Sequence, residues 1–388
     1  MCITAPEGFV ASGVPCGIRK SGRRDLALVR SLVPATGAGL FTANRLQAAP
    51  VVVSREHLEQ AQPQVVVVNS GVANAATGAR GIADARATAA EAGLLLGVSP
   101  QEVLVLSTGV IGAPLPLARV LGGVRAAALQ LARAGGAVAA EAIMTTDTRA
   151  KEAVARGTGF TVGGMAKGSG MIHPNLATML VVLTTDYPLE PGEALPFLRP
   201  AVDASFNAIS VDGECSTNDA VLLLANGASR IVRTPASDTE LSLLLREVCA
   251  NLARQIVADG EGATVLAEIA VRGAASGPEA RAIAERVATS PLVKTALFGH
   301  DANWGRIASA AGSARFDGGY AQLDPELLTI VIDGVPVFVS GKPTGDEPSL
   351  RDGSCAIEID LALGDGAASY LTTDLSDAYV RINAAYRS

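Results

Sequence analysis

Histidine, cysteine and aromatic residues are scarce in this chain, and their scarcity excludes several kinds of site. Only three of the 388 residues are histidines, at positions 57, 173 and 300, and none of them has the spacing of a zinc site. The five cysteines are odd in number and lie far apart, which is typical of reduced thiols and not of a disulfide framework. We therefore expect neither a metal centre nor a disulfide-stabilised scaffold.

Excess positive charge, long apolar runs and a secretory leader are also missing. The 31 lysines and arginines are outnumbered by 38 aspartates and glutamates, so the net charge is −7 and no cationic field attracts nucleic acid. Although 49% of the residues are hydrophobic, no apolar run approaches the ~18 residues that a membrane-spanning helix needs. Residues 1–7 have neither the basic nor the apolar region of a signal peptide. We expect a cytoplasmic protein that binds neither nucleic acid nor a membrane.

Three widespread motifs are absent as well. The chain has no G-x-S-x-G nucleophile elbow, no G-x-x-x-x-G-K-[ST] phosphate loop and no G-x-G-x-x-G dinucleotide fingerprint. Serine hydrolases of the common type and the common nucleotide-binding folds are therefore set aside.

Short β-branched segments alternate with alanine- and leucine-rich segments along the chain, which indicates mixed layers of helices and strands. We expect strands at 64–68, 103–106, 160–165, 178–184, 264–271, 328–332, 336–339, 356–363 and 369–373. We expect helices at 84–96, 115–133, 194–206 and 238–258. Glycine and proline gather between these segments, and residues 273–278 are the best candidate for a domain boundary.

Four polar loops adjoin the apolar segments: Asn69–Gly71, Ser107–Gly109, Met144–Asp147 and Lys167–Gly170. Glycine lets backbone amides approach a ligand, and hydroxyl groups donate or accept hydrogen bonds without adding charge. Each loop taken alone is more often a plain turn. Four of them in one chain favour a ligand-binding site.

Thr178 opens an apolar strand directly after a glycine-rich loop and a proline. A threonine hydroxyl is a poor nucleophile without a neighbouring base, and the chain has few histidines to serve as one. If the bond before Thr178 were cut, the new α-amino group, with an ordinary pKa near 7.7–8.0, could accept the proton. Thr178 could equally be an ordinary β-former at the start of an interior strand.

The segment around Thr178 resembles the signature of the ornithine acetyltransferase family, also called glutamate N-acetyltransferase, which is cut by the protein itself between Ala and Thr. The similarity covers essentially the whole chain in order. Further segments similar to the family are Gly17–Lys20, Asp25–Leu28, Phe41–Arg45, Ser107–Gly112, Ala142–Asp147, Asp212–Asp219, Asp259–Thr264, Ser290–Ala296, Asn303–Arg306, Thr372–Ser376 and Tyr379–Val380.

The resemblance implies a role for individual residues. Thr178 falls on the nucleophile, with the cut between Ala177 and Thr178, and Thr108 and Gly109 fall on the oxyanion hole. The positions that the family uses to contact substrate are Thr145, Lys167, Thr178, Glu261, Asn383 and Ser388. By charge, Lys167 would suit a carboxylate and Glu261 an amine.

The resemblance also implies a fold and a reaction. We expect an α+β protein with a layered α/β/β/α sandwich of the self-processing N-terminal-nucleophile type, and a smaller C-terminal α+β domain at about 278–388. The cut gives an α fragment, 1–177, and a β fragment, 178–388, in a heterotetramer of two of each. An acetyl group passes from N-acetylornithine to glutamate through an acetyl-threonine, in arginine synthesis and without a cofactor. Family members differ on whether acetyl-CoA is also a donor.

The chain departs from the family pattern in three places. Val265 stands where the family usually has a lysine, and Val72 and Ala76 stand where it often has asparagine and cysteine, which puts substrate choice in doubt. Two alternatives stay open. An amidase or aminopeptidase with the same cut threonine would let water resolve the ester, and a small-molecule binding protein would remain uncut.

Overall fold

The computed structural model describes residues 2–19, 21–173, 179–350 and 353–385, and the chain divides into two compact units. The larger unit takes in Met1–Asn207 and Glu214–Ile256, and the smaller unit takes in Ala208–Gly213 and Val257–Tyr386. The domain boundary expected at 273–278 lies inside the smaller unit. It overlaps the end of strand β10 (Val265–Ala274), which pairs with two other strands of that unit.

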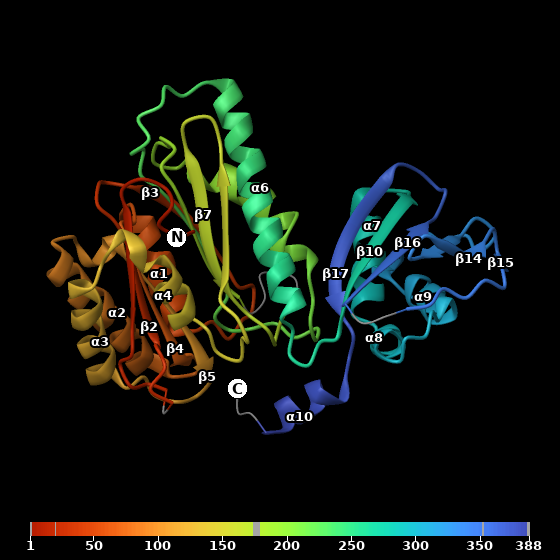
Figure 1. Cartoon of the computed structure of the whole chain (residues 1–388), viewed down its shortest axis with the longest axis horizontal. Coiled ribbons are helices and arrows are strands. Elements are labelled where there is room, and N and C mark those ends of the chain that lie inside the picture. Colours follow the sequence, from red (N-terminus) through yellow and green to blue (C-terminus); the bar gives the residue numbers. More distant parts are fainter. Residues whose placement is uncertain (1, 20, 174–178, 351–352, 386–388) are drawn as a thin grey trace. The chain divides into compact units, whose positions relative to one another are not determined.

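Two sheets build the larger unit (Figure 1). The first sheet has the order β1 (Phe9–Val14), β2 (Leu26–Ser31), β4 (Val65–Val72), β5 (Val103–Val110). The second has the order β3 (Thr36–Phe41), β9 (Ala220–Ala225), β8 (Leu180–Thr185), β7 (Thr161–Lys167), β6 (Lys151–Arg156). β4 runs parallel to β5 and β8 runs parallel to β9, while the other neighbours are antiparallel.

The two sheets pack face to face, and helices cover their outer faces. Successive side chains of a strand point to opposite faces, so Val66 lies in the core between the sheets while Val65 lies in the core under the helices. The helices over the first sheet are α1 (Ala49–Gln60), α2 (Gly78–Leu96) and α3 (Leu117–Leu129) (Figure 1). The second sheet is covered by α5 (Ala194–Asp203) and α6 (Pro235–Ala258). A Cβ added to Gly164 of β7 would come within 2.9 Å of Leu252 of α6. The predicted α+β class and the α/β/β/α layering are confirmed.

Glycines let helix α4 (Gly136–Ala142) approach the first sheet closely. A Cβ at Gly13 of β1 would lie 2.0 Å from the carbonyl oxygen of Val138, so no larger residue fits there. The Ser70 hydroxyl at the end of β4 donates to the carbonyl oxygen of Ala142 at 2.8 Å. This contact holds the segment after α4 beside the end of β4.

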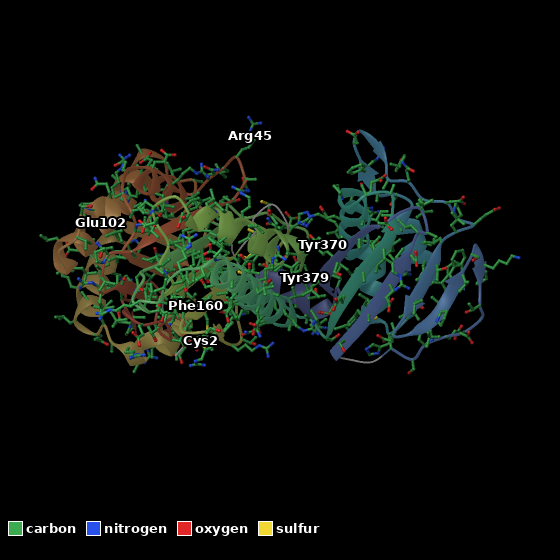
Figure 2. The ribbon with its side chains drawn as sticks, turned by 90° about the horizontal axis from the view of Figure 1, so that it is seen from above. Cys2, Arg45, Glu102, Phe160, Tyr370 and Tyr379 are labelled. Carbon is green, nitrogen blue, oxygen red and sulfur yellow. The ribbon has the colours of Figure 1, made fainter. Side chains whose placement is uncertain are left out.

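Aromatic packing adds little to this unit because aromatic residues are so few. Phe160, labelled in Figure 2, packs edge-on against Tyr187 with ring centroids 4.8 Å apart.

In the described ranges of the chain, no helix is both long and apolar enough to cross a membrane.

The smaller unit has one main sheet with helices packed on it. The sheet has the order β15 (Lys342–Pro343), β14 (Val335–Val339), β13 (Thr329–Ile332), β16 (Gly353–Asp360), β10, β17 (Gly366–Thr373). The helices of the unit are α7 (Gly277–Ala288), α8 (Pro291–Phe298), α9 (Trp304–Ala311) and α10 (Asp377–Ala385). The smaller unit is thus of the α+β class.

Candidate active site

The ends of β4 and β5 bring two of the predicted polar loops side by side. In the parallel register, Ser70 lies opposite Thr108 and Gly71 lies opposite Gly109. Gly109 has φ +130°, and a Cβ there would lie 2.3 Å from the carbonyl carbon of Gly71, so only glycine fits. Both strands end at the same edge of the sheet because they are parallel, and the loops meet there.

Of the hydroxyl groups at this edge, one has no partner in the part of the chain that the structure describes. The Ser107 hydroxyl donates to Asn69 Oδ1 at 2.6 Å, and the Ser70 hydroxyl is bound to Ala142. Thr108 is 6% exposed, and its hydroxyl makes no hydrogen bond to a described residue. It is therefore available to donate to a ligand.

Asn218 joins this edge to the second sheet. Its side-chain nitrogen donates to the carbonyl oxygens of Ser107 at 2.8 Å and of Ala73 at 2.7 Å. Its side-chain oxygen accepts from the Thr217 hydroxyl at 2.6 Å. Because Asn218 lies two residues before β9, these bonds link the ends of β4 and β5 to the start of β8 and β9.

Asp219 follows Asn218 and holds the residue just before β8. Its Oδ1 accepts from the backbone N–H of Met179 at 2.9 Å, and the Ala220 N–H donates to the Met179 carbonyl at 3.1 Å. Asp219 is 1% exposed. Burial raises the pKa of its carboxyl group well above the usual value, against the opposing effects of the Met179 N–H and the charge of Lys167.

Asp147 organises the other two polar loops. Its Oδ1 accepts from Lys151 Nζ at 2.6 Å and from the Gly168 N–H at 2.7 Å, and its Oδ2 accepts from the Thr145 N–H at 2.8 Å. Burial alone would raise the pKa of Asp147, but the charges of Lys167 and Lys151 outweigh it and hold the pKa at about 2. The carboxylate therefore fixes Thr145 and the backbone beside Lys167, which is itself buried.

Arg19 connects Thr145 with the ends of β4 and β5. Its guanidinium donates to the carbonyl oxygens of Met144 at 3.0 Å and of Thr145 at 2.8 Å. A Cβ at Gly71 would lie 3.1 Å from Arg19 Cγ, so the arginine stem packs against the glycine that faces Gly109. Thr108, Gly109, Thr145 and Lys167 thus belong to one connected arrangement in the larger unit.

Two other predicted residues meet in the smaller unit. Asn383 Nδ2 donates to Glu261 Oε2 at 2.9 Å and to the Tyr379 carbonyl at 3.1 Å. Gly262, with φ +70°, packs against the first turn of α10, where Figure 2 labels Tyr379. Val265, which departs from the family pattern, is 3% exposed and lies in the apolar core of this unit. The remaining predicted residues, Ala177, Thr178 and Ser388, lie outside the described residues.

Several residues in these contacts had no predicted role. Arg19, Asp147, Asn218 and Asp219 lie in segments that resemble the family, but only the folded chain shows what they bind. An Asn-Asp pair directly before an apolar segment is the signal that could have found Asn218 and Asp219. Within the described ranges, no cluster of three or more His, Cys, Asp or Glu side chains could hold a metal ion.

The sequence profile of the ArgJ family matches residues 10–388 of this chain. The arginine biosynthesis bifunctional protein ArgJ of Syntrophotalea carbinolica is 47% identical over 395 residues, which cover 98% of this chain and 99% of that protein. The protein of the same name from Thermobifida fusca is 44% identical over 389 residues, 100% of both chains. The solved structure of ornithine acetyltransferase with ornithine from Mycobacterium tuberculosis is 42% identical, with a TM-score of 0.43, over 45% of this chain and 94% of that chain.

Proposed function

The chain belongs to the ArgJ family, and we propose that it cuts itself between Ala177 and Thr178 and then moves the acetyl group of N-acetylornithine to glutamate. It is an enzyme of arginine biosynthesis, a glutamate N-acetyltransferase. The cut would leave fragments of residues 1–177 and 178–388. A heterotetramer of two α and two β fragments in the cytoplasm belongs to the same proposal.

The reaction is a double displacement. The amino group of Thr178 takes the proton of its own hydroxyl, and the oxygen attacks the acetyl carbonyl of N-acetylornithine. The carbon–nitrogen bond breaks, ornithine leaves with the proton, and an acetyl ester of Thr178 remains. The amine of glutamate then attacks the ester, the carbon–oxygen bond breaks, and the threonine hydroxyl regains a proton. No cofactor takes part.

The observation that carries this proposal is the arrangement at the ends of the two sheets. A buried, uncommitted hydroxyl at Thr108 and the close-packed Gly109 are the groups that an oxyanion hole needs. Asn218 and Asp219 tie this edge to Met179, which is bonded to Thr178. The donors that would meet the developing charge are therefore anchored to the residue that follows the nucleophile.

Substrate recognition is proposed for the charged and polar residues that match the family's substrate contacts. Thr145 and Lys167, both held around Asp147, would bind the carboxylate end of the amino acid. Glu261 and Asn383, bonded to each other, would bind the amine, together with Ser388. Both substrates share the amino-acid head, so one set of contacts serves both half-reactions.

Mass spectrometry of the purified chain tests the cut. We expect two fragments from the wild-type chain and a single chain without transfer activity from Thr178→Ala. Two fragments from Thr178→Ala would show that an outside protease makes the cut, and would contradict self-processing.

Kinetics with and without glutamate test the transfer. We expect glutamate to accelerate the release of ornithine from N-acetylornithine and to appear as N-acetylglutamate in equal amount. Release of acetate at the same rate without glutamate would instead identify a hydrolase of the same nucleophile type. Replacing N-acetylornithine by acetyl-CoA in the same assay shows whether the thioester is a second donor.

A further inference from the structure

Arginines gather around one cavity of the larger unit, which has a volume of about 430 Å³. The arginines that line it are Arg19, Arg23, Arg24 and Arg149. The rest of the described lining consists of Glu141, Met144, Thr148 and Ala150. Four guanidinium groups therefore share the cavity with one carboxylate, in a chain whose net charge is −7. Charge of one sign gathered in a cavity attracts small ions of the opposite sign.

A buried aspartate organises each of the two chain segments that supply these arginines. The connection between β1 and β2, which supplies three of them, is held by the buried Asp25. Asp25 Oδ1 accepts from the Cys16 N–H at 2.6 Å, and its Oδ2 accepts from the Arg19 N–H at 2.8 Å. The connection between α4 and β6, which supplies Arg149, is held by Asp147 in the same way. A carboxylate thus ties down both connections, which favours a preformed cavity over a plain surface loop.

Two of the arginines link these connections to each other and to α4. The guanidinium of Arg19 donates to the carbonyl oxygens of Met144 at 3.0 Å and of Thr145 at 2.8 Å. Arg24 Nη1 donates to Glu141 Oε2 at 2.8 Å, and both side chains of this ion pair remain about half exposed. Because the partners come from the two segments that line the cavity, these bonds hold its two walls together.

The side chains of the other two arginines make no hydrogen bond or ion pair with any described residue. Arg23 lies on the wall that follows β1, Arg149 lies on the other wall, and both are exposed. A guanidinium group carries five N–H donors in a planar fork that matches the oxygens of a phosphate. A single exposed arginine is ordinary at a protein surface. Two without such partners, one on each wall of a cavity that two further arginines line, indicate a site for an anion with several acceptor oxygens.

We propose that this cavity binds a small molecule carrying two or more phosphate groups, whose oxygens pair with the guanidinium groups of Arg23 and Arg149. A cavity of about 430 Å³ is in the size range of small-molecule sites and exceeds what a single phosphate ion fills. A carboxylate has two oxygens and one negative charge, whereas linked phosphates offer oxygens and charge to both walls at once. The proposal goes beyond acetyl transfer and does not depend on it, because the described lining contains none of the residues predicted to contact the substrate or the oxyanion.

Isothermal titration calorimetry of the purified protein with inorganic pyrophosphate tests the site. We expect one pyrophosphate bound per chain, with an affinity that falls as the salt concentration is raised. The double variant Arg23→Gln with Arg149→Gln should raise the Kd for pyrophosphate at least about 10-fold, because hydrogen bonds to a charged ligand are lost on both walls. Arg19 and Arg24 are left unchanged, since they hold the walls together.

The double variant Arg199→Gln with Arg246→Gln is the matched control. These arginines lie on α5 and α6 of the same unit, are exposed and have no side-chain partner among the described residues. The control removes the same charge elsewhere, so it should leave the Kd for pyrophosphate almost unchanged. Equal weakening in both double variants would overturn the proposal, because only the overall charge would then matter. A wild-type protein that binds no pyrophosphate, or that binds the tricarboxylate citrate more tightly, would overturn it too.

Two sources can provide this phosphate chemistry, and competition in the calorimeter separates them. If the phosphate groups are those of an acyl thioester donor, coenzyme A should displace pyrophosphate from the wild-type protein, and pantetheine, which has no phosphate, should not. If the ligand is a free phosphorylated molecule, neither compound should displace pyrophosphate. Each of these results keeps the site and assigns its ligand. Failure of the proposed acetyl transfer shows in the kinetics of the wild-type chain and leaves the pyrophosphate titration unchanged.

Discussion

Thr108 differs from its polar neighbours because its hydroxyl is not used by any described residue. The Ser70 hydroxyl donates to a backbone carbonyl oxygen, and the Ser107 hydroxyl donates to the side-chain oxygen of Asn69. A buried hydroxyl without a hydrogen bond to a described residue can donate to the negative charge that develops in the proposed reaction. At the residue scale, the Thr108 hydroxyl marks the candidate site because it makes no hydrogen bond to a described residue.

We predict that Thr108→Ala lowers kcat for acetyl transfer by about 10²–10³, the usual effect of losing one oxyanion donor, with a much smaller change in KM. Thr108→Ser keeps the hydroxyl and should retain most of the activity. Steady-state kinetics on fully cut protein make the measurement. Equal activity of the alanine and serine variants would remove Thr108 from the oxyanion hole.

Asp147 gives a prediction for stability in acid. Its pKa is about 2 in the folded chain against 3.8 ordinarily, so its contribution is fully present above pH 3.8 and is lost as the pH falls through 2. The difference corresponds to about 2 kcal/mol of unfolding free energy. We expect Asp147→Asn to be less stable at neutral pH and to lack this part of the loss below pH 4. Urea unfolding followed by circular dichroism across pH 2–7 measures it.

The exposed Glu59 provides the control for that experiment, since Glu59→Gln should reproduce the wild-type pH dependence. An Asp147→Asn chain that loses stability in acid as steeply as the wild type would show that Asp147 does not carry the effect.

At the scale of elements, the site depends on two parallel strands ending at the same edge. β4 and β5 approach so closely at Gly71 and Gly109 that a side chain at 109 would overlap the backbone of the neighbouring strand. Gly109, which we propose for the oxyanion hole, is therefore also the residue that lets the sheet close at this edge.

We predict that Gly109→Ala destabilises the chain by more than Gly112→Ala does. Both glycines have positive φ, at +130° and +80°, so both variants carry backbone strain of about 1–3 kcal/mol. No atom lies within 4 Å of a Cβ at Gly112, whereas a Cβ at Gly109 meets Gly71 at 2.3 Å. Thermal unfolding compares the two variants. Equal melting temperatures would mean that the strands can separate at this edge at no cost.

The sequence predicts helices and strands best where one signal, such as a run of valines, favours a single type of element. The strands at 64–68 and 103–106 are confirmed as the valine-rich parts of β4 and β5. β9 was missed because Val221–Leu224 reads equally well as part of a helix, and only its place between β3 and β8 makes it a strand. β6 was missed because it begins with Lys151, a charge that is buried only through its contact with Asp147.

In the candidate site, too, some residues have a local sequence signal and others gain their role only from the folded structure. The polar loops at 69–71 and 107–109 stand out in the sequence, and the fold pairs them residue by residue. The partners at 147, 218 and 219 do not stand out, because a carboxylate gains a role only from the groups that folding brings to it. Contacts between residues 40 apart, as between Met179 and Asp219, have no local signature.

At the scale of the whole molecule, the proposed cut falls between two strands that are neighbours in one sheet. β7 ends at Lys167 and β8 begins at Leu180, and the two are paired along their length. The fragment before residue 178 supplies β3, β7 and β6, and the fragment after it supplies β9 and β8. In the second sheet, the two strands of the second fragment therefore lie between strands of the first fragment. The cut fragments can separate only if this sheet comes apart.

We predict that the cut changes how the protein refolds but not whether its fragments stay together. The fragments should co-elute in native gel filtration and separate in denaturant, because each lacks strands that the shared sheet and its core require. On dilution from denaturant, refolding of the cut protein should slow as the protein concentration is lowered, since two chains must meet. Thr178→Ala, with a single chain, should refold at a rate independent of concentration. Refolding of the cut protein at a rate independent of concentration would mean that a fragment folds alone, against the shared sheet.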